Sequence, residues 1–208
     1  MFIPRTFLAA TAAAVVFGVI IAPPINADDA QSVKSETVPA TGSFTFTTSP
    51  GVLPAWNSAN ISMTAISPGS LTQLTATASQ RLELPVVAKT GSANALSGGF
   101  RLTNTKTRES LNCLIPTVDT KARVLDCVTI GAGAVWETNR VFFAISEIGF
   151  RERSTNNSET TSTFRDMNFV VASTTMADYL NEQLSTTVFT TSVSIATGTL
   201  ETTRMGER

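Results

Sequence analysis

The sequence contains no histidine, only two cysteines and a single tyrosine among its 208 residues. Without histidine, the chain can build neither a Ser-His-Asp triad nor a Cys-His pair, and it lacks the commonest metal ligand. The sequence also shows no phosphate-binding glycine loop, no G-x-G-x-x-G and no G-x-S-x-G motif. These absences predict a protein that is not an enzyme and that uses no metal and no cofactor.

Charged residues are scarce as well, at 15% of the chain, and their signs nearly cancel to a net charge of −1. A nucleic-acid-binding domain presents a strongly basic face. Here the basic residues between positions 101 and 123 are interleaved with acidic ones such as Glu109 and Asp119. We therefore expect a solvated rim at this place and predict no nucleic-acid partner.

Long apolar runs are absent except for one, at residues 7–22. Arg5 precedes this run, two prolines end it, and the small residue Ala27 follows. A basic start, an apolar run and a small residue, in this order, are typical of a secretory signal, whereas a membrane-spanning helix needs ~20 apolar residues. We expect residues 1–27 to be a signal peptide cleaved after Ala27. The mature protein is then secreted or held at the exterior of the cell envelope, with no membrane span.

The rest of the chain is rich in threonine and serine, and apolar residues reach 42% of the sequence. The β-branched threonine suits a half-exposed pleated sheet. Several short segments alternate apolar and polar residues between turn residues, a pattern that is typical of a β-sandwich or a closed barrel. The expected strands are residues 43–48, 60–66, 81–87, 100–103, 111–117, 123–130, 140–150, 163–172 and 193–202.

From these segments we predict a mainly β fold, an antiparallel β-sandwich-like single domain over residues 43–203. A polar stretch without periodicity, residues 28–42, is expected to be a flexible leader, and residues 204–208 a tail.

One short helix is expected near the carboxyl end of the chain, at Thr175–Gln183. Thr175 and Asp178 have the spacing of a capping box. Met176, Leu180 and Leu184 follow at helical spacing and form one apolar stripe. A helix this short must pack on the sheet to persist.

Cys113 and Cys127 are the only cysteines, and in an exported protein they are expected to form a disulfide. A hairpin that turns about residue 120 places Cys113 opposite Cys127 and Ile115 opposite Leu125, with all four side chains facing the core. The bridge closes a loop worth about 3 kcal/mol in the chain-entropy model. A redox pair is the alternative, but such pairs usually have C-x-x-C spacing.

Paired carboxylates are the remaining option for general acid–base chemistry. Glu147, Glu152 and Asp166 lie near the ends of neighbouring expected strands, and two facing carboxylates can hydrolyse a glycoside. Trp56 and Trp136 could offer a carbohydrate platform, although tryptophans beside turns more often close a core. Because 16 acidic residues on a small β-domain will form some pairs by chance, a glycoside hydrolase is the least favoured interpretation.

Several segments together resemble the β-rich, haem-transport-associated type of domain found in secreted and envelope proteins of actinobacteria. In that family a glycine pair opens a strand, a proline and an aspartate mark a hairpin, and a short A-x-x-L-N helix precedes the closing strand. The resemblance extends over residues 44–202. It is carried by SGGFRL at 97–102, PTVDT at 116–120, ADYLNEQL at 177–184, VF at 188–189 and IATG at 195–198.

The resemblance implies haem as a candidate ligand, since some members of the family bind haem through a tyrosine assisted by a histidine. The one tyrosine here, Tyr179, lies on the expected helix, either as a ligand-binding residue or as an aromatic that packs the helix on the sheet. Met63 and Met176 are expected in the core, and neither sequence neighbour of Tyr179 is an arginine that would favour the ionised phenol. We therefore predict no tight haem binding.

The favoured function is an exported, non-enzymatic extracellular or cell-envelope protein. It is expected to bind another protein, a glycan or a cell-wall component. A small-ligand carrier of the haem type is the first alternative, and a carboxylate-based glycoside hydrolase is the second. A carrier requires a pocket and a hydrolase requires two facing carboxylates, so the fold distinguishes these classes.

Overall fold

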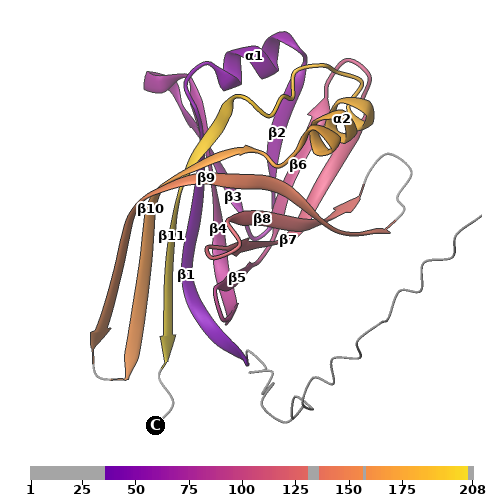
Figure 1. Cartoon of the computed structure of the whole chain (residues 1–208). Helices are drawn as coiled ribbons and strands as arrows, with labels where there is room; N and C mark the ends of the chain where they lie inside the picture. The colour runs from indigo at the N-terminus through magenta and orange to yellow at the C-terminus, as the bar shows by residue number, and fades with distance from the viewer. Residues whose placement is uncertain (1–35, 131–135, 157, 206–208) are drawn as a thin grey trace, which may run out of the picture. The chain divides into compact units, whose positions relative to one another are not determined.

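The structure is a computed structural model that describes residues 36–130, 136–156 and 158–205 (Figure 1). The expected signal peptide, residues 1–27, lies outside the described residues, as do residues 28–35 of the expected leader and 206–208 of the expected tail. No helix in the described ranges is long and apolar enough to cross a membrane.

The described chain consists mainly of antiparallel strands, which confirms the predicted β-rich class. In chain order the elements are β1 (Thr37–Thr48), α1 (Val52–Ser58), β2 (Ile61–Ile66), β3 (Ser70–Leu74), η2 (Thr75–Thr77), β4 (Ser79–Thr90), β5 (Ala93–Leu96), β6 (Gly99–Asn104), β7 (Ser110–Asp119), β8 (Val124–Ile130), β9 (Trp136–Asn156), β10 (Glu159–Val171), α2 (Thr174–Gln183) and β11 (Ser194–Met205).

The strands form one sheet that closes on itself. β7, β5, β4, β1, β11, β10, β9 and β8 pair in that order, and β8 pairs back with β7, so eight antiparallel strands form a ring. β6 and β2 extend from β7, and β3 pairs with β4. This arrangement corrects the sandwich-like expectation. The same alternation of apolar and polar residues serves both architectures, and only the long-range pairing decides between them.

Phenylalanine side chains fill the interior of the closed sheet. Phe46 stacks on Phe143 with ring centroids 5.4 Å apart, and Phe44 meets Phe169 edge to face at 5.9 Å. The first pair connects β1 with β9, three strands away around the ring, and the second connects β1 with β10, two strands away. Aromatic pairs of this kind add about 0.5–1.5 kcal/mol each beyond the area they bury. A packed interior leaves the ends of the strands as the places where hollows can form.

The predicted disulfide between Cys113 and Cys127 is present, with the two Cα atoms 5.4 Å apart. The predicted register around it is wrong. Cys113 lies opposite Thr129, and Cys127 is its diagonal neighbour on β8, still within reach of a bridge.

A β-bulge explains the error in register. Ile115 and Pro116 together oppose the single residue Cys127, because the pairing shifts between Leu114 and Thr117. Ile115 has a positive φ of 48° and is 62% exposed, so it does not face the core as expected. Pro116 has no N–H to donate, and a bulge is where a strand tolerates it.

The helix near the carboxyl end is confirmed, with a different cap. α2 begins at Thr174, and the Ser173 hydroxyl, not Thr175, accepts a hydrogen bond from the Met176 N–H at 3.1 Å. Met176, Leu180 and Leu184 are buried, as the apolar stripe predicted.

A second helix, α1, was not expected from the sequence. The prediction of a single helix near the carboxyl end is therefore wrong. α1 has only seven residues, no side-chain cap and no acidic residue in its first turn, so it carries few of the signals that mark a helix start. It persists because Val52, Leu53 and Trp56 are buried.

Two of the expected boundaries also change. β1 begins at Thr37, inside the segment for which we expected no regular structure, because Thr37 and Val38 pair with Thr90 and Lys89 of β4. At the other end, β11 continues to Met205, into the expected tail.

Candidate functional site

An apolar pocket of about 320 Å³ lies between α1 and the segment that joins α2 to β11. Its inner wall contains Trp56 and Phe189, each only 2% exposed, with ring centroids 5.7 Å apart. Val193 borders the pocket and is 50% exposed, so that side is open to solvent. The lining residues are Pro50, Gly51, Val52, Ala55, Trp56, Val188, Phe189, Thr190, Val193 and Ile195.

The turn from β1 into α1 sets one side of this pocket. Gly51 adopts a left-handed conformation, with φ of 85°, which a residue with a Cβ rarely takes. The Val52 N–H donates to the Ser49 carbonyl at 3.1 Å. Ser49 in turn is tied to the start of β11, since its N–H donates to the Ile195 carbonyl at 2.9 Å. These bonds fix α1 against the first residues of β11.

A hydrogen-bonded clamp on Phe189 sets the opposite side. The Asn181 side chain, on α2, donates to the Phe189 carbonyl and accepts from the Phe189 N–H, both at 3.0 Å. α2 is itself attached to β6, because the buried Asn104 amide donates to the Leu184 carbonyl at 2.8 Å. Phe189 therefore has a fixed backbone although it lies outside the regular elements. Asn181 is the asparagine of the A-x-x-L-N segment, but the sequence alone did not show its role.

The residues that line the pocket are uncharged and mostly apolar. None of its ten residues has a titratable side chain, and Thr190 supplies the one side-chain hydroxyl. The lining also contains no tyrosine, methionine or cysteine that could coordinate a haem iron. Such a pocket suits a neutral apolar molecule and offers no group for acid–base or nucleophilic catalysis.

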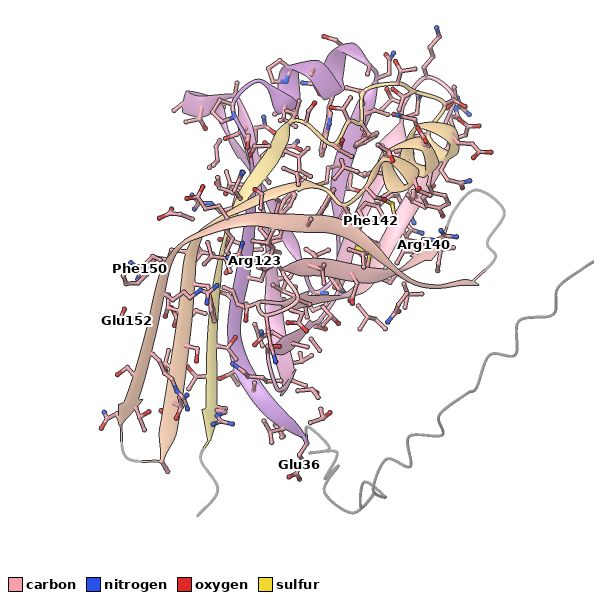
Figure 2. All side chains as sticks on the ribbon, in the orientation of Figure 1. Glu36, Arg123, Arg140, Phe142, Phe150 and Glu152 are labelled. Carbon is pink, nitrogen blue, oxygen red and sulfur yellow. A yellow bond between two sulfur atoms is a disulfide. The ribbon has the colours of Figure 1, made fainter. Side chains whose placement is uncertain are left out.

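Tyr179, the candidate ligand-binding residue, does not line this pocket. It is partly buried on α2 and packs against the hydrophobic core. The guanidinium of Arg140, on β9, lies over its ring at 4.4 Å from the centroid, a cation–π contact. Figure 2 shows Arg140 on β9 close to α2. The sequence neighbours of Tyr179 supplied no arginine; the fold brings one from a distant strand, a contact that sequence reasoning missed.

The three candidate carboxylates do not line a common hollow among those described. Asp166 borders a polar hollow on the outside of the sheet with Arg81, and Glu152 borders a different hollow with Arg151. Glu147 is exposed on β9 and borders none of the hollows described. Across residues 36–130, 136–156 and 158–205, no group of three or more Asp, Glu or Cys side chains is placed to hold a metal ion.

Trp56, one of the two platform candidates, is buried in the wall of the apolar pocket. The side chain of Trp136 lies outside the described residues.

Comparison with known proteins identifies no family for this chain. No protein-family model matches the chain, and no curated protein matches it. Among solved structures, the crystal structure of the haem-binding protein HtaB from Corynebacterium glutamicum is similar, at 12% sequence identity. The match covers 83% of this chain and 99% of that chain with a TM-score of 0.42. This is a weak resemblance in fold.

Proposed function

We propose that the protein is an exported, non-enzymatic carrier that binds a small, neutral, apolar molecule in the pocket between α1 and residues 188–195. The observation that supports this proposal is the pocket itself, with its buried aromatic wall, its open side at Val193 and a lining without charge. Among the classes expected from the sequence, a concave apolar site favours a small-ligand carrier over a protein that binds through a flat face.

The size and lining of the pocket define the ligand class. A volume of about 320 Å³ is at the lower end of the range for small-molecule sites. With no charged group to meet a charged ligand, affinity would come from the apolar surface removed from water. Each buried methylene is worth ~0.8 kcal/mol, or about a fourfold change in affinity. A series of primary alcohols should therefore bind more tightly with each added methylene until the pocket is filled.

A neutral fluorescent probe tests the proposal. N-phenyl-1-naphthylamine should bind with 1:1 saturation and increased emission. Val193→Asp, which places a charge at the open side, should weaken binding about tenfold or more. The matched control is Val87→Asp, since Val87 is a similarly exposed valine (47%) on β4 away from the pocket. Equal binding by the two variants, or no saturation by the unmodified protein, would contradict a ligand in this pocket and favour binding through a surface.

Haem is expected to be a poor ligand, although the sequence resemblance suggested it. The apolar pocket has no iron-coordinating side chain, and Tyr179 lies under Arg140 outside that pocket. Titration of the mature protein with haemin should give no saturable shift of the Soret band. A stoichiometric shift that Tyr179→Ala abolishes would overturn this expectation and make Tyr179 the ligand.

Export has its own test, because residues 1–27 lie outside the described residues. Expressed with its full sequence in a secreting bacterium, the protein should appear outside the cytoplasm with Asp28 as its first residue. Amino-terminal sequencing measures this directly. A protein that keeps residues 1–27 and stays in the cytoplasm would contradict the proposed export.

A further inference from the structure

Three basic side chains from three strands of the closed sheet share a second hollow, far from the apolar pocket. Lys89 on β4, Arg153 on β9 and Arg204 on β11 line a hollow of about 160 Å³ together with Gly91 and the hydroxyl residues Thr160 and Ser162. This gathering is unexpected on a chain whose net charge is −1. Neither the apolar pocket nor the aromatic core requires it.

The register of the sheet puts these side chains on one face. Arg153 lies opposite Ser162, and Arg204 lies opposite Thr160. Thr160 and Ser162 are two residues apart on β10, so their side chains point to the same side of the sheet. Directly opposed residues have Cβ atoms about 4.5–5.5 Å apart, and diagonal ones about 7–8 Å. Two guanidinium groups and two hydroxyls therefore lie within the reach of a single small ion.

Lys89 adds a third positive charge, and its surroundings disfavour the protonated form of its amine. Burial lowers the pKa of its amine, and the positive charges of Arg204 and Arg153 lower that pKa further. Among the described residues, no carboxylate forms an ion pair with Lys89, Arg153 or Arg204. Like charges held close together without a counter-charge destabilise a sheet. A bound anion would remove that repulsion.

A larger hollow of about 480 Å³ adjoins the first and shares Lys89, Gly91, Arg153 and Ser162 with it. It adds Arg151, whose guanidinium lies over the Phe164 ring at 6.0 Å from the centroid, and one acid, Glu152. Glu152 alternates with Arg151 and Arg153 along β9 and so belongs to the opposite face. Figure 2 shows it beside Phe150 on the outer side of that strand.

Hydrogen bonds hold the turn between β4 and β5, which contributes Gly91 and Ser92 to the wall of this hollow. Ser92 lines the larger part, and its carbonyl accepts from the buried Asn94 amide at 3.0 Å. Asn94 also accepts from the Thr202 hydroxyl at 2.9 Å, across the interior from β11 to β5. The Ser92 hydroxyl donates to Asp119 at 2.7 Å, and the Lys121 and Ala122 N–H groups donate to the same carboxylate. These bonds hold the turn in place, and Lys89, Arg153 and Arg204 themselves lie on strands.

We propose that Lys89, Arg153 and Arg204, with Thr160 and Ser162, form a binding site for a phosphate group. Two guanidiniums, one ammonium and two hydroxyls provide more donors than the two oxygens of a carboxylate can use. A tetrahedral oxyanion with three or four oxygens matches this set, and arginine forks suit it. The adjoining hollow, with Phe164 and Arg151, leaves room for an organic body that carries the phosphate.

Titration calorimetry of the full-length mature protein tests this site, with inorganic phosphate and glucose 6-phosphate as probes and chloride at equal ionic strength as the reference. Both phosphates should bind with 1:1 saturation, and Lys89→Gln and Arg153→Gln should each weaken binding about tenfold. The control is Lys106→Gln, an exposed lysine in the turn before β7, which should bind like the unmodified protein. Tighter binding of glucose 6-phosphate than of inorganic phosphate would support a phosphate carried on a larger molecule. Equal affinities would support recognition of the oxyanion alone.

Three results would overturn the proposal: no saturable heat with either phosphate, the same heat with chloride, or an equal loss of binding in Lys106→Gln. Because Lys89 and the two arginines line a hollow rather than a packed core, these variants should remain folded, and circular dichroism verifies this. The proposal is independent of the apolar pocket, since none of its residues lines that pocket.

Discussion

The two ends of β1 carry opposite chemistry. At its carboxyl end, the apolar pocket begins at Pro50; at its amino end, Val38 pairs with Lys89 of the basic hollow. From Val38 to the end of β1 at Thr48 the strand rises by ten residues, or about 33 Å at ~3.3 Å per residue. The pocket is lined by apolar residues of α1 and of connecting segments, around the buried Trp56 and Phe189, whereas the charged residues of the hollow all lie on strands.

This difference indicates how a closed sheet with a solid core can bind ligands. The interior is packed with phenylalanines, and both proposed sites lie where strands end. At one end, helices add apolar walls that belong to the core. At the other end, the strands continue beyond the packed core and carry the basic side chains of Lys89, Arg153 and Arg204. Changes at the first end should therefore affect stability and binding together, and changes at the second end should affect binding strongly and stability only slightly.

The largest expected effect contrasts Trp56→Ala with Arg153→Ala. Trp56 is 2% exposed, so removing its ring should lower the free energy of unfolding by about 3–5 kcal/mol through lost burial and the cavity left behind. Arg153 is exposed, and its removal should change that free energy by no more than about 0.5 kcal/mol. Urea denaturation followed by circular dichroism measures both. Equal losses of unfolding free energy in the two variants would contradict the proposed difference between the two ends of β1.

The disulfide lines neither the apolar pocket nor the basic hollow, so its removal is a reference for changes at the two sites. Replacing both Cys113 and Cys127 by alanine should lower the free energy of unfolding by about 3 kcal/mol, because the unfolded chain regains the freedom of the closed loop. The affinities for N-phenyl-1-naphthylamine and for phosphate should stay unchanged when measured below the unfolding transition. A loss of either affinity would show that the bridge also shapes a binding site.

A smaller loss is expected for Asn181→Ala, which removes the clamp on Phe189. The Phe189 N–H and carbonyl each lose a partner at 3.0 Å, so the free energy of unfolding should fall by about 1–3 kcal/mol. Binding of N-phenyl-1-naphthylamine should weaken as well. Asn112→Ala is the control, since Asn112 makes a hydrogen bond with the exposed Arg101 on the sheet surface. Should both variants bind the probe as the unmodified protein does, Phe189 would need no clamp to form the pocket.

The smallest effect concerns pH at the basic hollow. The folded pKa of the Lys89 amine lies below its ordinary value of 10.5, so protonated Lys89 destabilises the folded state. This penalty is fully present below the lowered pKa and disappears as pH rises towards 10.5. Arg153→Gln should relieve part of it and raise the free energy of unfolding at neutral pH by a few tenths of a kcal/mol. Unfolding curves between pH 7 and pH 10.5 should show the gain shrinking as pH rises; a constant gain would assign it to something other than Lys89.

Local patterns in the sequence predicted the elements better than their assembly. Alternation located the strands around Phe44, Met63 and Phe169, and helical spacing located α2, because both patterns arise from burial of one face. Closure of the sheet by the β7–β8 pairing cannot be predicted from the local alternation of apolar and polar residues. The register near the disulfide failed because strict two-residue periodicity ignored Pro116, which marks the bulge.

The candidate sites were harder to predict than the fold. Trp56 and Phe189 are far apart in the sequence, and a seven-residue helix without a cap brings them together. Lys89, Arg153 and Arg204 likewise come from three separate strands and form no motif. Arg140 reaches Tyr179 only after β9 and α2 pack on each other. In each case contacts between distant parts of the chain bring the residues together, and composition and residue spacing do not reveal such contacts.

The most direct test of the proposed carrier function uses Trp56 as a reporter. The chain has two tryptophans, so Trp136→Phe leaves Trp56 alone in the wall of the pocket. Titration with N-phenyl-1-naphthylamine should then quench Trp56 emission with 1:1 saturation while probe emission rises by energy transfer, and decanol should reverse both changes. The same protein with Val193→Asp added should show neither change. Unsaturable quenching, or quenching that Val193→Asp leaves intact, would show that no ligand occupies this pocket and would contradict the account.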